Sequence, residues 1–283
     1  SNVIGYGYLL TFYLKQKENN FTFLFFNGTI LIIFVSILIN FFTPLHSNIT
    51  NILFIIFTII GSYKVYREIF YSHNFKLIIF VLLFASTIIF KSYPYNDYEF
   101  YHLPYIEILR NFKIIFGLSN FEFSYGYPSI FQNITALQYN LFMKLDSFIF
   151  YTPLLVSVLL GETFFKYIKL DNLIIKFLSY IFIVNFLIHA NRYGSLGNDF
   201  PAHAISMFSY ILFFSIIFID KNNKKLYLFI LTLIIAIFAK LTLLLNLLLI
   251  IPIFLFKRNI LKLNTRTLIF ILIVTFSILL KNF

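Results

Sequence analysis

The stretch FTFLFFNGTILIIFVSILINFFT, residues 21–43, contains no charged side chain. A helix needs about 20 predominantly apolar residues to cross the hydrocarbon core of a bilayer, and this stretch is long enough to do so. Further apolar segments lie at about 3–14, 49–63, 77–91, 147–165, 173–190, 200–219, 226–240, 241–256 and 264–280. Three of them (49–63, 226–240 and 241–256) are shorter than a span, which is typical of tilted, half-spanning or re-entrant helices.

The composition indicates the same fold class. Of the 283 residues, 60% are hydrophobic, 22% aromatic and 12% charged, and the mean hydropathy is +0.87. Soluble domains carry about 25% charged residues, so this chain has too little polar surface to cover itself in water. We predict an all-α, polytopic transmembrane protein with about 9–10 apolar segments, which form a single domain over residues 1–283. The chain is expected to be truncated at both ends, and without cysteine it has no disulfide framework.

The net charge of +11 does not indicate a nucleic-acid partner, because Lys and Arg lie in short clusters between the apolar segments. Fifteen of the 22 fall in five loops, at 15–20, 64–76, 166–176, 221–225 and 257–266. Cytoplasmic loops are enriched in Lys and Arg, so these five loops are predicted to face the cytoplasm. The long loop 92–146 is then external.

Two amphipathic helices are predicted within loop 92–146. Pro104 suits the first turn of a helix over 104–116. Residues 126–145 place Ile130, Ile134, Leu137 and Leu141 on one stripe, with polar side chains on the other faces. Neither segment is apolar enough to cross the bilayer, so both are expected to be juxtamembrane helices that lie on the membrane surface.

The stretch SYPYNDYEFYHLP, residues 92–104, differs from its apolar surroundings. It brings Asp97, Glu99 and His102 together directly after an apolar segment. All three are candidate site residues. The alternative for Asp97 is that it caps a helix starting near Tyr98, and the alternative for Glu99 is a solvated helix face.

A second external loop, NRYGSLGND (residues 191–199), is the other candidate region. It holds Arg192, ends in Asp199, and leads into a helix that begins Phe-Pro-Ala-His203. Asp199 suits the N-cap of a helix over 200–219, and that role is compatible with membership of a site. Because both loops are predicted on one face, we expect the carboxylates of Asp97 and Asp199 to converge.

The motifs NDYEFYHLP (96–104) and SLGNDFPAH (195–203), with Ala-Lys-Leu-Thr at 239–242, resemble sequences of the GT-C superfamily of multi-pass glycosyltransferases. The second motif is similar to the Ser-Pro-Asp-x-Pro type found at a helix start in bacterial members. The resemblance covers roughly 77–256. It implies an enzyme of the bacterial inner membrane that takes a sugar from a polyprenyl-phosphate donor, with its active site facing the periplasm. Asp97-x-Glu99 replaces the adjacent acidic pair common in several branches.

An inverting glycosyl transfer needs one carboxylate as a general base, which takes the proton of the acceptor. Asp97 is the candidate base, with Glu99 and Asp199 as further catalytic carboxylates. The leaving phosphate needs positive charge, either from a divalent metal or from Lys and Arg. Mg²⁺ or Mn²⁺ held by Asp97 and Asp199 is therefore one expectation.

Four side chains are candidates for binding the donor: His102, Arg192, His203 and Lys240. Lys240 lies between two apolar segments whose outer ends are both predicted to be cytoplasmic, so the chain must turn near it on or toward the external side. A charge in that position needs a partner. The partner is a lipid phosphate in one interpretation, whereas in the other the side chain reaches the headgroup region by snorkelling.

Two other function classes are compatible with the composition. A transporter or flippase for a lipid-linked sugar would carry ionisable or Gly/Pro-broken segments at the bilayer midplane, whereas here Glu162 alone lies within a long span, near its end. A non-catalytic membrane scaffold would use the external loop to bind a partner. The expected partners are the polyprenyl-phosphate-linked donor and membrane lipids, and the sequence specifies neither the sugar nor the acceptor.

Overall fold

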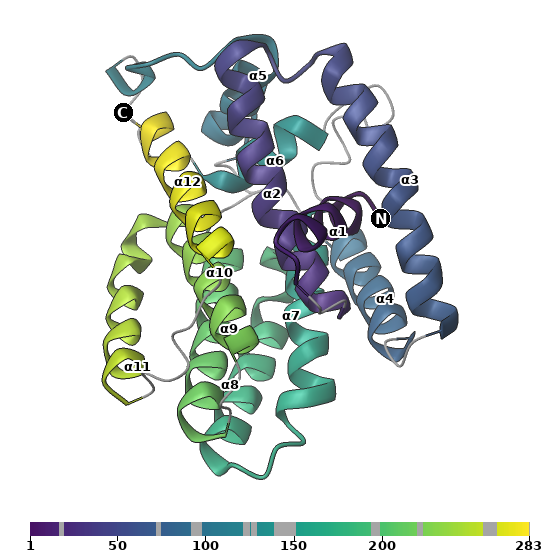
Figure 1. Cartoon of the computed structure of the whole chain (residues 1–283), viewed down its shortest axis with the longest axis vertical. Coiled ribbons are helices and arrows are strands. Elements are labelled where there is room, and N and C mark those ends of the chain that lie inside the picture. Colours follow the sequence, from purple (N-terminus) through teal and green to yellow (C-terminus); the bar gives the residue numbers. More distant parts are fainter. Residues whose placement is uncertain are drawn as a thin grey trace.

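The computed structural model describes residues 1–16, 20–71, 75–91, 98–120, 125, 129–138, 151–193, 199–219, 223–256 and 265–282. All regular elements in these ranges are helices (Figure 1). The α-helices are α1 (Asn2–Tyr13), α2 (Phe21–Phe42), α3 (Asn48–Tyr71), α4 (Phe75–Lys91), α5 (Leu103–Asn111), α6 (Ile130–Gln138), α7 (Tyr151–Glu162), α8 (Leu173–His189), α9 (Asp199–Phe218), α10 (Asn223–Ala239), α11 (Ile250–Phe256) and α12 (Thr265–Asn282). The π- and 3-10 segments are η1 (Tyr98–His102), η2 (Leu118–Asn120), η5 (Thr163–Tyr167), η6 (Ala190–Arg192) and η7 (Leu241–Leu249).

Most helices coincide with apolar segments of the sequence, α5 and α6 being the amphipathic exceptions, and the all-α prediction is confirmed for the described residues. Four stretches are long and apolar enough to cross a membrane: Phe21–Phe42, Asn48–Arg67, Leu173–Arg192 and Asp199–Phe218. Three apolar helices are shorter: Phe75–Phe90, Lys225–Ala239 and Leu241–Phe256. The second candidate span begins with segment 49–63, whose helix continues to Tyr71 and is therefore longer than expected.

The candidate spans differ in how much of their surface lies inside the protein. α2 and α9 are mostly buried, whereas α3 and α8 expose apolar side chains along their length. Ile59 of α3 is 65% exposed and Ile188 of α8 is 70% exposed. An apolar outer surface of this extent is unfavourable in water and is compatible with contact to lipid.

α1 packs between α2 and α3 through glycine contacts, near the middle of the molecule in Figure 1. A Cβ atom on Gly7 of α1 would lie 1.8 Å from the carbonyl oxygen of Leu24, and one on Gly28 of α2 would lie 1.8 Å from the carbonyl oxygen of Val3. Only glycine permits two helix backbones to approach so closely. α1 is therefore packed into the domain on the two faces that meet α2 and α3.

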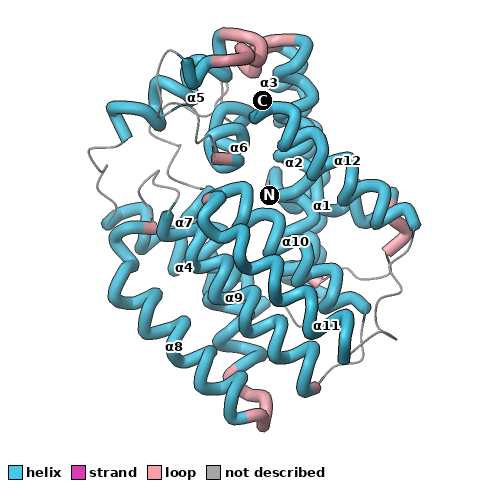
Figure 2. The backbone as a smooth tube through the Cα atoms, turned by 90° about the vertical axis from the view of Figure 1, so that its left-hand side faces the viewer, coloured by secondary structure: helices cyan, strands magenta, loops and turns pink. Residues whose placement is uncertain are grey.

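α9 is the centre of a second group of helices. α7, α8 and α10 pack around it, and Figures 1 and 2 show these helices together in the lower half of the molecule. Phe208, Ile211 and Leu212 of α9 are completely or almost completely buried in this group. Ion pairs lie at the two ends of this group, between Lys240 and Asp199 at one end and between Lys166 and Glu162 at the other.

α6 is buried inside the protein, whereas the prediction that it lies at the membrane surface stays a prediction. Its residues from Ile130 to Leu137 are buried, including Gln132 and Asn133. Gln132 Nε2 lies 2.8 Å from Nδ1 of His102, and Asn133 Oδ1 accepts a hydrogen bond from Nζ of Lys281. These protein partners bond to Gln132 and to the Asn133 side-chain carbonyl, whereas Nδ2 of Asn133 is buried without a hydrogen-bond partner among the described residues.

The predicted helix over 104–116 is shorter in the structure. α5 has Pro104 in its first turn, as expected, but it ends at Asn111, where Phe112 becomes extended. Of the predicted helix over 126–145, residues 139–145 lie outside the described residues.

Candidate functional site

The chain reverses at Lys240, between two apolar helices. α10 ends at Ala239, Lys240 has an extended backbone with φ −151° and ψ 110°, and η7 begins at Leu241. The Lys240 N–H donates to the carbonyl of Ala236 at 3.0 Å, and the Lys240 carbonyl accepts from the N–H of Leu243 at 3.0 Å. Since its two peptide groups bond to both helices, the position of Lys240 is well defined.

The Lys240 side chain reaches the start of α9. Its Nζ lies 2.9 Å from Oδ1 of Asp199, the first residue of that helix. The Asp199 side chain is 63% exposed and the Lys240 side chain 27%. An ion pair this exposed contributes only about 0–1 kcal/mol, so the ammonium can exchange the carboxylate for another anion at little cost.

Phe200 gathers further basic side chains beside this ion pair. The guanidinium carbon of Arg192 lies 4.8 Å from the centroid of the Phe200 ring, and the His189 ring lies 5.0 Å from it. Because Phe200 directly follows Asp199, these contacts hold the end of α8 and η6 against the first turn of α9. His203, one turn further along α9, is exposed and interacts electrostatically with both Lys240 and Asp199.

We call His189, Arg192, Asp199, Phe200, His203 and Lys240 the α9 cluster. These side chains include two permanent cations, Arg192 and Lys240, and one carboxylate. The N-terminus of α9 adds a partial positive charge, because its first backbone N–H groups lack partners within the helix. The cluster is therefore suited to an anion, and to a phosphate group in particular.

A comparison with known protein families identifies the family of this chain. A family model described as "Domain of unknown function (DUF8201)" matches residues 2–283. The chain belongs to this family. No curated protein and no solved structure matches it. The α9 cluster is thus part of a DUF8201 domain that extends over all the described helices.

The structure places the remaining predicted site residues of this DUF8201 domain as follows. Asp97 lies outside the described residues, so its convergence with Asp199 stays a prediction. Glu99 belongs to η1, and its side chain is not among those described. His102 is buried against Gln132 of α6, and its ring lies 4.2 Å from that of Tyr101. His102 thus belongs to the packing of α5 against α6.

The metal site expected of Asp97 and Asp199 stays a prediction, because Asp97 lies outside the described residues. In the part of the chain that the structure describes, no three His, Cys, Asp or Glu side chains gather to hold an ion. Mg²⁺ takes about six oxygen ligands. Asp199 instead binds the Lys240 ammonium, which would repel a divalent cation at the same carboxylate. Positive charge for a phosphate comes from Lys240 and Arg192 in this arrangement.

The sequence analysis did not single out two members of the α9 cluster, His189 and Phe200, and Phe200 is the one that joins the others. It lies in a chain where aromatic residues are abundant, so its residue type carries little information. The signal that identifies it is its position, directly after an acidic residue at a helix start and close to a loop that holds an arginine.

Proposed function

We propose that this DUF8201 protein is a polytopic membrane glycosyltransferase that moves a sugar from a polyprenyl-phosphate donor to an acceptor on the external face of the membrane. The observation that carries the proposal is the ion pair between Lys240 and Asp199. It sets an exchangeable ammonium at the end of apolar helices. In a bilayer crossed by α9, that end of the helix lies at the level of the lipid phosphates.

Lys240 and Arg192 act on the leaving phosphate in this mechanism. When the sugar leaves the donor, the bond between its anomeric carbon and the phosphate oxygen breaks, and the electron pair stays on the phosphate. Cations that are already in place stabilise this charge without reorganisation. Asp199 positions the Lys240 ammonium before the donor arrives and gives it up to the phosphate.

Asp97 acts as the general base in this mechanism. The acceptor oxygen forms the new bond to the anomeric carbon while its proton passes to the Asp97 carboxylate. Glu99 lies two residues further along the same stretch of chain and is the further catalytic carboxylate there. The resemblance to the GT-C superfamily supports this assignment of Asp97.

The test of this function uses the full chain in membrane vesicles. Transfer of a labelled sugar from polyprenyl-phosphate donors to envelope acceptors is measured for the wild type and for Asp97→Asn. We expect the variant to lose transfer about 10²–10⁴-fold, which is the usual contribution of a general base. Asp171→Asn is the matched control, because Asp171 is an exposed carboxylate whose nearest cation is Lys176, at 3.9 Å. The control is expected to keep full transfer.

The same assay separates the other two function classes. Unchanged transfer in Asp97→Asn would contradict the role of Asp97. An absence of transfer in both the wild type and the variant would favour a scaffold. Movement of the lipid-linked sugar across the bilayer without a new glycosidic bond would favour a transporter.

A further inference from the structure

A second polar cluster lies in the same group of helices and takes no part in the proposed transfer. The Glu162 carboxylate, at the end of α7, is only 5% exposed. Its Oε2 accepts a hydrogen bond of 2.8 Å from Thr22 of α2, and its Oε1 lies 2.7 Å from Nζ of Lys166. Lys225 of α10 donates to Ser215 of α9 at 3.0 Å. The side chains thus come from four different helices and η5.

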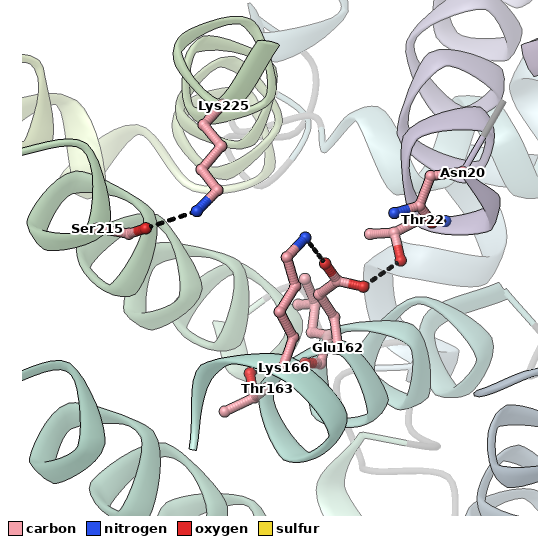
Figure 3. A network of polar contacts seen from close by, with 8 residues as sticks. Asn20, Thr22, Glu162, Thr163, Lys166, Ser215 and Lys225 are labelled. Carbon is pink, nitrogen blue, oxygen red and sulfur yellow. Dashed lines mark hydrogen bonds and ion pairs between the residues drawn. The ribbon is translucent and has the colours of Figure 1, made fainter. Parts of the chain in front are cut away.

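The two ammonium groups of this cluster lie near one aromatic ring. Figure 3 shows the Lys225 ammonium directed at Ser215 and the Lys166 ammonium directed at Glu162. The ring of Tyr167 lies beneath both lysines, with centroid distances of 5.6 Å to Lys166 Nζ and 5.7 Å to Lys225 Nζ. Both distances are within the range of a cation–π contact. We call Thr22, Glu162, Lys166, Ser215 and Lys225 the Glu162 cluster.

The Glu162 cluster and the α9 cluster lie at opposite ends of the same helices. Asp199 and Ser215 are separated by sixteen residues of α9, which corresponds to about 24 Å. Lys225 and Lys240 stand at the two ends of α10. The α-helical residues between them are predominantly apolar and buried. A separation of this size approaches the thickness of a bilayer core, about 30 Å.

The Glu162 cluster has features that favour an anion. It contains two ammonium groups and one carboxylate, together with two hydroxyls. Lys225 is the third residue of α10, where the partial positive charge of the helix N-terminus makes a cation unfavourable and an anion favourable. The Lys166 side chain is 42% exposed, so the cluster is accessible from outside the protein.

We propose that the Glu162 cluster binds the phosphate of an anionic lipid headgroup, on the face of the membrane opposite the α9 cluster. Lys225 and Lys166 are the phosphate ligands, and Ser215 supports Lys225. Basic pockets between helices on the cytoplasmic side are suited to headgroups of this kind. The proposal fits the concentration of Lys and Arg in the loops predicted at this end, and it does not depend on the sugar-transfer activity.

The experiment measures the apparent midpoint of thermal unfolding of the full chain in two kinds of nanodisc. One contains phosphatidylcholine alone, and the other also contains phosphatidylglycerol. We expect phosphatidylglycerol to raise the midpoint of the wild type by about 2–4 °C. Lys225→Met should lose this rise and Lys225→Arg should keep most of it. Lys176→Met, which removes one positive charge from the start of α8, is the control that keeps the rise.

Glu162→Gln separates a binding site from a purely structural clamp. It removes the carboxylate that competes for Lys166, so the rise caused by phosphatidylglycerol should be larger than in the wild type. If the cluster only holds the helices together and binds no ligand, Glu162→Gln should lower the midpoint of thermal unfolding in both kinds of nanodisc, without a larger rise from phosphatidylglycerol.

Inorganic phosphate in phosphatidylcholine nanodiscs distinguishes the source of the anion. Inorganic phosphate could raise the midpoint of thermal unfolding in a way that depends on Lys225, while phosphatidylglycerol does not. That result would show that the cluster binds a soluble phosphate and would contradict the proposed lipid. No rise with either anion, or a rise that survives Lys225→Met, would overturn the site.

Discussion

Lys240 combines a fixed backbone with an exchangeable side-chain partner. Its peptide groups bond to both α10 and η7, whereas its ammonium makes an exposed ion pair with Asp199. A weak internal partner of this kind keeps a cation oriented and prevents it from folding back into the apolar surroundings. Two substitutions test whether the ammonium is reserved for a phosphate.

Lys240→Ala is expected to weaken binding of polyprenyl monophosphate by about 10- to 100-fold, because a hydrogen bond to a charged group contributes about 1.5–3 kcal/mol. Lys240→Arg should keep part of the affinity, since it keeps the charge but changes the geometry. Binding is measured on the purified protein in nanodiscs with a labelled lipid. An unchanged affinity in the alanine variant would reduce Lys240 to a snorkelling side chain.

Asp199→Asn is expected to act in the opposite direction and to strengthen binding of polyprenyl monophosphate by up to about fivefold. The reason is that the exposed ion pair, which contributes at most about 1 kcal/mol, no longer competes with the phosphate. If Asp199 instead held a metal that bridges to the phosphate, the same variant would bind the lipid more weakly. The direction of the change in the dissociation constant therefore decides between the two roles.

At the level of the elements, close backbone contact makes α1 part of the domain. The contact of Gly7 with Gly28 has a counterpart on the other side of α1, where a Cβ on Gly5 would lie 2.0 Å from the carbonyl oxygen of Phe57 in α3. Helices in lipid gain no hydrophobic stabilisation from association, so van der Waals packing of this kind holds them together. The packing of α1 with α2 and α3 is therefore expected to be destabilised by the addition of a single methyl group at these glycines.

Gly28→Ala should lower the free energy of unfolding by about 3 kcal/mol, because its Cβ meets rigid backbone at 1.8 Å. Gly161→Ala in α7 is the matched control. There the Cβ would meet side chains and not backbone, at 2.5 Å from Cδ1 of Leu77 and 3.1 Å from Cδ1 of Phe80, and alanine gains about 0.5–1 kcal/mol in helix propensity. We expect a change below about 1 kcal/mol for the control, measured by denaturant unfolding in detergent. Equal losses in both variants would contradict the tight contact of α1 with α2.

For the whole molecule, the two polar clusters define two ends of one helical group. The loop after η5 lies at the same end of this helical group as the Glu162 cluster. From there α8 runs to the opposite end, where His189 and Arg192 belong to the α9 cluster. Because a bilayer tolerates such polar ends only at its two surfaces, the ends are expected to face opposite sides of the membrane.

Single cysteines test this orientation, and the natural chain has none to remove. Asn120→Cys, in the predicted external loop, should react in intact cells with a membrane-impermeant thiol reagent. Lys169→Cys, after η5, should react only when the membrane is opened. Both positions are exposed in the structure, so access by the reagent is not limited by burial. Labelling of Lys169→Cys alone from outside would reverse the assignment of faces and remove the external active site.

Most of the helices and the turn at Lys240 could be predicted from the sequence. Both follow from local properties, because uninterrupted apolar segments form helices in a low-dielectric environment and the basic loops limit where the chain turns. The candidate residues Asp199, Arg192, His203 and Lys240 were also visible in the sequence, since polar side chains are rare in this chain.

The contacts between side chains of different helices could not be predicted from the sequence. Four features depend on the packing of helices far apart in the chain: the pairing of Lys240 with Asp199, the role of Phe200, the burial of α6, and the approach of Lys166 and Lys225 to the Tyr167 ring. The apolar faces of these helices are nearly uniform in Ile, Leu and Phe, so many helix arrangements bury them equally well by composition. Specific close contacts, such as that of Gly7 with Gly28, and specific polar pairs select one of these arrangements, because a lost contact or an unpaired polar group inside the protein costs free energy.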